Sequence, residues 1–88
     1  MKLNECRAVI TGASGGIGQA LVAALLEEGA QLLLVGRQTD ALQMLANAHT
    51  SKVQVVQADI RERSGREAVV AAAQRFGGIN TLINAAGV

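Results

Sequence analysis

The sequence predicts an α/β fold, a doubly wound parallel sheet of four strands with three helices. Two observations predict it: short apolar runs alternate with stretches of helical spacing, and the first strand-to-helix junction holds four glycines within residues 12–18. Strands buried on both faces of a parallel sheet are almost continuously apolar. In the usual order for this fold, the strands lie 3-2-1-4 across the sheet.

The first half of the chain predicts a strand, a turn, a helix and a second strand. Residues 6–11 (CRAVIT) and 31–35 (QLLLV) are largely apolar runs with glycine at their boundaries, as buried strands have. Gly29 stands where a left-handed C-cap would end the helix between them. The apolar residues of that helix, at helical spacing, are Ile17, Ala20, Leu21, Ala24 and Leu25.

A second helix and a third strand follow. Thr39 is a suitable N-cap for this helix, which is expected to end near His49. Its apolar positions, which fall on one face, are Leu42, Leu45 and Ala46. The third strand is predicted around residues 53–56. Gln54 and Gln57 make it the most polar of the strands, which favours a position at the edge of the sheet.

A third helix and a fourth strand complete the predicted fold. Ser64 and Glu67 have the spacing of a capping box ahead of the apolar residues 68–73, and Gly77-Gly78 ends the helix. Residues 81–84 form the last strand. Right-handed crossovers would place the first two helices on one face of the sheet and the third on the other.

Composition indicates one small domain that covers residues 1–88 and excludes several classes of protein. Half of the 88 residues are apolar, and proline, tyrosine and tryptophan are absent, which is the profile of a folded aliphatic core. A net charge of +1 with interspersed signs favours neither nucleic acid nor a membrane surface as partner. Cys6 has no partner for a disulfide, and the N-terminus lacks a signal-peptide pattern, so a cytoplasmic location is expected.

The glycine turn indicates a site for a phosphate group. Glycines between a strand and a helix let a ligand approach the main chain, and the start of the helix supplies free N–H groups and partial positive charge. The spacing G-x-x-x-G-x-G of Gly12, Gly16 and Gly18 is not that of a P-loop, because no G-K-[ST] follows. The alternative is that the glycines only form a flexible turn.

Three motifs together resemble those of the short-chain dehydrogenases/reductases. Residues 11–18 (TGASGGIG) look like the T-G-x-x-x-G-x-G signature of that family. Asp59-Ile60 resembles its adenine-contacting Asp, and residues 84–87 (NAAG) resemble its N-N-A-G motif. The resemblance covers essentially the whole chain. It implies the N-terminal, NAD(P)-binding half of a Rossmann-type domain.

The resemblance also implies roles for single residues. Backbone groups from Ser14 to Ile17 would hold the pyrophosphate, the Asp59 carboxylate and the Ile60 backbone would read the adenine, and Thr11 would tie the first turn to Asn84. The full cofactor-binding set is Gly12, Ser14, Gly15, Gly16, Ile17, Gly18, Arg37, Asp59, Ile60, Asn84, Ala85, Ala86 and Gly87. Asp59 has a structural alternative, the capping of a short turn with Glu62. Thr11 and Asn84 could equally be a strand end and a turn former.

The end of the second strand favours NADP over NAD. An NAD site usually offers a carboxylate to the ribose 2′-OH at this point, whereas an NADP site offers a cation to the 2′-phosphate. Gly36 occupies the position of that acid, and Arg37 follows with a guanidinium that can bind phosphate oxygens. Asp40 lies in the first turn of the next helix, where an acid is favoured in any case. The alternative is that Arg37 is an ordinary solvated side chain.

No catalytic residue and no metal ligand can be named. The resembled family uses a Tyr-x-x-x-Lys pair with a serine, but this chain has no tyrosine, no serine after Ser64 and no lysine after Lys52. The chain by itself is therefore expected to be inactive. His49 and Cys6 are better explained as structural, since no nucleophile–base pair is visible. Two smaller departures are Ala85, in place of the second asparagine of the motif, and Asn80, where an aspartate is common.

Three functions remain open at this point. The preferred one is the N-terminal part of an NADP-dependent oxidoreductase, which would transfer hydride between NADPH and a carbonyl or alcohol substrate in the complete enzyme. The others are a module that binds the dinucleotide without chemistry and a remnant that binds none. The fourth strand would keep an open apolar edge where the full fold adds a fifth strand, so the isolated chain is also expected to form a homo-oligomer or to aggregate.

Overall fold

A computed structural model describes residues 2–13, 15–37 and 40–85 and shows a parallel sheet with the predicted order β3-β2-β1-β4. The strands are β1 (Arg7–Thr11), β2 (Gln31–Gly36), β3 (Val53–Gln57) and β4 (Thr81–Asn84). The predicted α/β fold is therefore confirmed. The most polar strand, β3, lies at one edge of the sheet, and β4 lies at the other.

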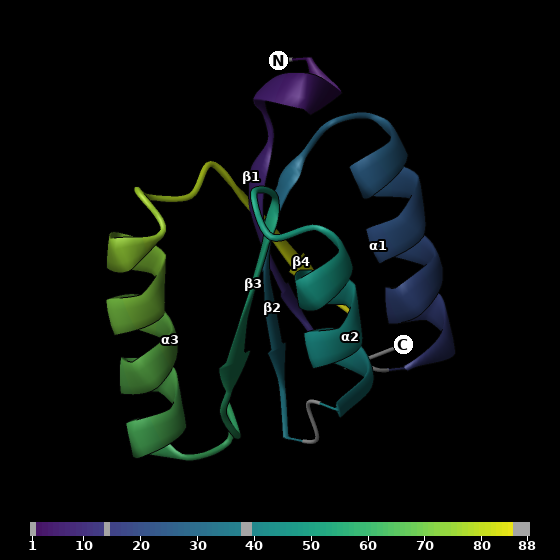
Figure 1. The fold of residues 1–88 in the computed structure, drawn as a ribbon. Helices are drawn as coiled ribbons and strands as arrows, with labels where there is room; N and C mark the ends of the chain where they lie inside the picture. The colour runs from purple at the N-terminus through teal and green to yellow at the C-terminus, as the bar shows by residue number, and fades with distance from the viewer. Residues whose placement is uncertain (1, 14, 38–39, 86–88) are drawn as a thin grey trace.

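The helices cover the two faces of the sheet as the crossover rule predicts. They are α1 (Gly16–Glu27), α2 (Asp40–Ala48) and α3 (Arg63–Arg75), and a short 3-10 helix, η1 (Leu3–Glu5), precedes β1. In Figure 1, α1 and α2 lie on one side of the sheet and α3 lies on the other. The sheet is the middle layer of a three-layer arrangement, with both faces in contact with helices.

The core is divided by the sheet into two clusters, because side chains alternate between its faces. On the α1 and α2 side, Ile10, Leu32 and Leu34 pack with Val22 and Leu42. On the α3 side the cluster contains Val9, Leu33, Val35 and Ala72. Strand β2 is buried from Leu32 to Gly36, which explains its uninterrupted apolar sequence.

Helix α1 faces the sheet with a different side from the one that its apolar spacing predicts. The buried positions are Gly18 and Val22, and Leu25 and Leu26 pack against the same cluster. Ile17, which was expected on the buried face, is 54% exposed. Gly18 lets α1 lie close to the turn that precedes it, because a Cβ at this position would collide with the backbone of Gly12 and Ala13.

Glycines end two helices as predicted, whereas the predicted capping box is wrong. Gly29 has φ +85° after α1, and Gly77 has φ +97° after α3, so both adopt the left-handed conformation that favours glycine. The N-cap of α3 is Glu62, without a side-chain cap hydrogen bond, and Ser64 lies inside the helix. Thr39, the predicted cap of α2, lies outside the described residues.

Asn80 joins the start of β4 to the start of β1. Its Oδ1 accepts a hydrogen bond from the Arg7 backbone N–H at 2.8 Å, and its Nδ2 donates to the Glu5 carbonyl at 2.9 Å. An aspartate could accept the first bond but could not donate the second. The asparagine at this position is therefore suited to the contact that it makes.

Candidate functional site

The predicted site residues gather at the carboxyl ends of the strands, which form one edge of the sheet. Strands β1, β2, β3 and β4 are parallel, so their carboxyl ends lie together, and the segments that follow them carry the candidate residues. Thr11 is in register with Val35 on β2 and with Asn84 on β4. Ligands of open α/β sheets bind at such an edge. Ser14, Ala86 and Gly87 were also predicted to belong here, and they lie outside the described residues.

Thr11 and Asn84 make the expected tie between β1 and β4. The Thr11 hydroxyl donates to the Asn84 Oδ1 at 2.9 Å, and the Ala85 backbone N–H donates to the Thr11 carbonyl at 2.9 Å. Thr11 and Ala85 are both buried. The first bond joins the last residues of the two strands and the second extends their pairing to Ala85, so Ala85 is held beside Thr11, directly before the glycine turn.

In the glycine turn, some positions require glycine because of the local structure and others do not. Gly12 has φ +69°, and a Cβ at Gly18 would lie 2.8 Å from the Ala13 Cα, so local structure requires glycine at both positions. A Cβ at Gly16 would meet no atom within 4 Å. The described residues therefore give no steric reason for Gly16, whereas a ligand close to the main chain would.

The start of α1 is suited to an anion. The N-cap, Gly15, has extended backbone and no side-chain cap hydrogen bond. The first N–H groups of a helix have no partner within the helix, and they carry the positive end of its dipole. Gly16, Ile17 and Gly18 supply these groups, and Gly15 and Gly16 add no side chain that would cover them. The structure fits the phosphate groups of a nucleotide at this point.

Arg37 and Asp59 line the same cavity, which has a volume of about 330 Å³. The other lining residues are Gln57, Ala58, Glu62, Ser64, Gly65 and Ala68. The Gln57 Nε2 donates to the Arg37 carbonyl at 3.0 Å, and the Ala58 backbone N–H donates to the Gly36 carbonyl at 3.0 Å. The ends of β2 and β3 are thereby held together, so a cation and a carboxylate share one cavity.

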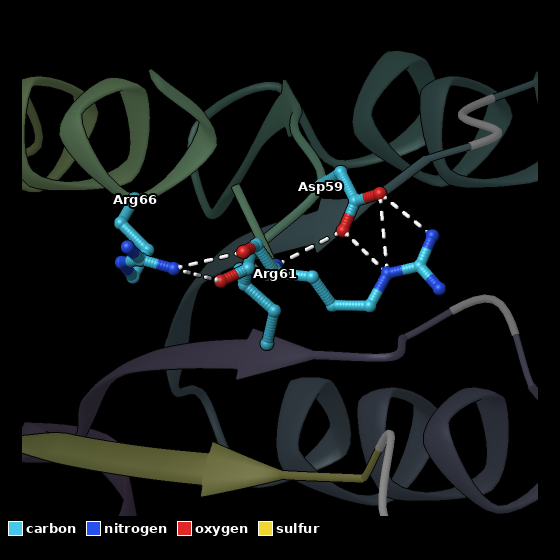
Figure 2. Close-up of polar contacts among 4 residues, drawn as sticks. Asp59, Arg61 and Arg66 are labelled. Carbon is cyan, nitrogen blue, oxygen red and sulfur yellow. Dashed lines mark hydrogen bonds and ion pairs between the residues drawn. The ribbon is translucent and has the colours of Figure 1, made fainter. Parts of the chain in front are cut away.

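The Asp59 carboxylate is bound by Arg61 (Figure 2). Arg61 donates from its Nη2 to Oδ2 at 2.8 Å and from its Nε to Oδ1 at 3.0 Å, and its backbone N–H also donates to Oδ1 at 3.0 Å. The side-chain hydrogen bonds from Arg61, with smaller contributions from its backbone and from Arg37, lower the pKa of Asp59 from 3.8 to about 2. Asp59 is therefore a carboxylate at neutral pH.

Asp59 also takes part in a short turn with Glu62, which is the structural alternative to a role in binding adenine. The Glu62 backbone N–H donates to the Asp59 carbonyl at 3.1 Å, which closes a turn ahead of α3. The Asp59 side chain, however, accepts a hydrogen bond from the Arg61 backbone N–H, whereas Glu62 bonds to the main-chain carbonyl of Asp59. The turn fixes the backbone and leaves the carboxylate at the cavity.

Helix α3 supports the Asp59 segment through two residues that sequence reasoning missed. Gly65 is buried against Asp59, and a Cβ at position 65 would overlap the Asp59 carbonyl oxygen. The Arg66 Nη1 donates to the carbonyls of Ile60 at 3.0 Å and Arg61 at 3.1 Å (Figure 2). The signal for Gly65 was an isolated glycine within a helical stretch, which often has a packing reason.

A family model described as short chain dehydrogenase matches residues 7–88 of the chain. The chain belongs to this family. An uncharacterized oxidoreductase of Staphylococcus aureus strain MRSA252 is 43% identical over 87 residues, which are 97% of this chain and 38% of that protein. A similar uncharacterized oxidoreductase of Staphylococcus epidermidis is 38% identical over 87 residues. The chain thus spans less than two fifths of the length of these curated relatives.

Solved structures of short chain dehydrogenases have the same fold. L-Sorbose reductase from Gluconobacter frateurii, solved with NADPH and L-sorbose, matches with a TM-score of 0.76 and 38% identity, over 88% of this chain and 31% of that one. A 3-ketoacyl-(acyl-carrier-protein) reductase from Brucella melitensis, solved with NADH, matches with a TM-score of 0.76 and 29% identity, over 88% of this chain and 32% of that one. Both phosphorylated and unphosphorylated dinucleotides therefore occur among these neighbours of the short chain dehydrogenase fold.

The described part of the chain contains neither a grouping of three or more metal-ligating side chains nor a helix long and apolar enough to cross a membrane. Cys6 is buried, and its thiol donates to the Thr81 hydroxyl at 3.4 Å. The thiol therefore has a structural contact between β4 and the start of β1.

Proposed function

We propose that the chain is the N-terminal, cofactor-binding half-domain of an NADP-dependent short-chain oxidoreductase. The observation that supports this most is the arrangement at the carboxyl ends of the parallel strands, where the glycine-built start of α1 follows β1 and the cavity lined by Arg37 and Asp59 follows β2 and β3. The start of α1 is suited to bind the phosphate groups of a dinucleotide. The cavity with Arg37 and Asp59 is suited to bind an adenosine that carries a 2′-phosphate.

The residues of the site divide into three groups along a bound dinucleotide. The backbone from Gly12 to Gly18 would hold the pyrophosphate, with Gly16 leaving room for it. Asp59 and the Ile60 N–H would bind the adenine edge, which presents an amino donor and a ring-nitrogen acceptor. Asn84, Ala85, Ala86 and Gly87 would line the side toward the nicotinamide.

Arg37 would select the phosphorylated cofactor. Its side chain is exposed at the cavity, directly after the buried Gly36 that ends β2. A guanidinium pairs well with a phosphate, whereas no carboxylate follows β2 at this point to accept the ribose 2′-OH of NAD. NADP is therefore proposed in preference to NAD.

The reaction of the complete enzyme would be hydride transfer with a carbonyl or alcohol substrate. A bound nicotinamide dinucleotide supplies or accepts the hydride, and this chain orients the dinucleotide and neutralises its phosphates. The described residues offer no tyrosine–lysine pair for proton transfer, so turnover by the chain alone is not expected.

Calorimetric titration of the chain with NADPH and, in parallel, NADH tests the proposal. Tighter binding of NADPH is expected, together with a thermal stabilisation of about 2.7 kcal/mol at a hundredfold excess over the dissociation constant. Equal affinity for the two cofactors would contradict the assignment of NADP. Absence of binding by either would contradict a functional cofactor site in this chain.

Self-association is proposed on a separate observation. Strand β4 is an outer strand of the sheet, and Leu82 on it is 68% exposed. Leu82 is in register with Val9, on the face that α3 covers, but α3 packs mainly against β3 and β2. In the chain taken by itself, an apolar strand with an open edge favours pairing with a second copy. A cytoplasmic location is also kept as a proposal, because Cys6 is a free thiol.

A further inference from the structure

Both oxygens of the Asp59 carboxylate accept hydrogen bonds from Arg61 within the chain. A carboxylate has about four lone-pair positions. Oδ1 accepts from the Arg61 backbone N–H and from Nε, both at 3.0 Å, and Oδ2 accepts from Nη2 at 2.8 Å and from Nε at 3.3 Å. Because the single Nε proton is shared between the two oxygens, the backbone N–H, Nε and Nη2 of Arg61 together cover both of them, and withdrawal of the Arg61 side chain makes the carboxylate more accessible to a donor from a ligand.

The Arg61 side chain is free to withdraw while its backbone stays in place. Its side chain is 71% exposed, and the close-up shows its guanidinium in contact with Asp59 alone among the residues drawn (Figure 2). The carbonyl of Arg61 is held by Arg66 from α3, so the main chain that carries it is anchored separately. Withdrawal therefore breaks an exposed ion pair and leaves the turn intact.

We propose that Arg61 competes with the adenine amino group for Asp59 and thereby weakens the binding of adenine nucleotides to this chain. The inference rests on the proposed function, in which Asp59 binds the adenine edge. Arg61 would thus lower the affinity of the site for adenine nucleotides, because its ion pair with Asp59 has to break when the adenine binds.

The competition also affects the choice of base. Adenine presents an amino donor to Asp59, whereas hypoxanthine presents a carbonyl oxygen at the same position. A carboxylate repels that oxygen, but the Arg61 guanidinium can donate to it. Arg61 should therefore reduce the preference of the site for adenine over hypoxanthine, which a purely structural residue would not do.

Titration of the wild-type chain and Arg61→Ala with NADPH and with its hypoxanthine analogue tests this proposal. Arg61→Ala is expected to bind NADPH about two- to fivefold more tightly, because exposed ion pairs of this kind contribute little net free energy. The hypoxanthine analogue should bind the variant no better than it binds the wild type. Arg63→Ala is the matched control, since Arg63 is exposed, lies two residues away and pairs with Glu67.

The nitrogen-bound proton signal of the Arg61 Nε in a heteronuclear NMR spectrum gives an independent measure of the competition. Addition of NADPH should move this signal, whereas the Arg63 signal should stay in place. If Arg61→Ala binds NADPH no more tightly than Arg63→Ala does, the proposed competition is wrong. Binding of NADPH by the wild-type chain would in that case still support the proposed function. If neither the wild type nor Arg61→Ala binds NADPH, the proposed function and this inference both fail.

Discussion

Gly65 on α3 lies against the carbonyl of Asp59 so closely that a β-carbon at position 65 would overlap the oxygen. The contact sets the distance between the first turn of α3 and the segment that follows β3. Asp59 lines the cavity at the carboxyl edge of the sheet, so a helix-packing contact positions a candidate ligand-binding side chain.

Gly65→Ala is expected to destabilise the chain, although alanine is the better helix former. The new methyl group forces α3 or the Asp59 backbone to move, and overpacking of this kind costs about 1–3 kcal/mol. Gly16→Ala is the matched control, since its Cβ meets nothing within 4 Å. Urea denaturation should show a lower stability for the first variant only; equal stabilities would disprove the steric requirement.

Thr11→Val is expected to lower the free energy of unfolding by about 0.5–1.5 kcal/mol, the net contribution of an ordinary hydrogen bond. Valine keeps the shape of the buried side chain but removes the hydroxyl that donates to Asn84. The exposed Thr50 provides the control variant Thr50→Val. A loss of the same size in both variants would mean that the bond to Asn84 contributes nothing specific.

The ion pair between Asp59 and Arg61 predicts a pH dependence at the acid end. Because the pKa of Asp59 is lowered from 3.8 to about 2, its contribution to stability is complete above pH 3.8 and is lost as the pH falls from there toward 2. NMR titration of the carboxyl carbon should show this low pKa. In Arg61→Ala the pKa should return most of the way to 3.8, whereas Arg63→Ala should leave it low.

Arg37→Ala is expected to weaken NADPH binding by about 1.5–3 kcal/mol, the value of a hydrogen bond to a charged group, and to leave NADH binding nearly unchanged. Arg75→Ala makes the same change of charge in the last turn of α3 and should alter neither affinity. Calorimetric titration of both variants with both cofactors measures this difference. Equal losses for NADPH and NADH in Arg37→Ala would refute the proposed selectivity.

Leu82→Lys is expected to reduce self-association of the chain. The residue is exposed on the outer strand β4, so a lysine there should leave the fold intact and place a charge on the proposed contact surface. Sedimentation velocity at increasing concentration should show a smaller average mass for the variant. A monodisperse monomer in the wild type at high concentration would contradict the proposed self-association.

Local sequence signals were sufficient where one physical cause dominates. The apolar run of β2 predicted a central strand, because only a strand covered on both faces is apolar throughout. Gly29 and Gly77 predicted helix ends, because a left-handed residue is needed there and glycine adopts it without strain. The gathering of Thr11, Arg37, Asp59 and Asn84 at one edge followed from parallel strands and their order.

Tertiary contacts decided the features for which several residues were equally suitable. Helix α1 is apolar on most of its surface, so its spacing could not show that Gly18 and Val22 face the sheet while Ile17 is exposed. Likewise, Ser64 had the pattern of an N-cap, but α3 begins at Arg63. A local pattern identifies residues able to fill a role, and packing against the rest of the chain selects among them.

By itself, the sequence determined the α/β fold, the strand order and the edge of the sheet at which the candidate site lies, because these depend on periodicity, glycine positions and the handedness of crossovers. Only the tertiary structure decided that Arg61 occupies the Asp59 carboxylate and that Gly65 and Arg66 hold the same segment from α3. The contacts from α3 depend on how closely that helix approaches the segment after β3, and the contact of Arg61 depends on the turn that this packing holds, and neither leaves a periodic pattern in a sequence.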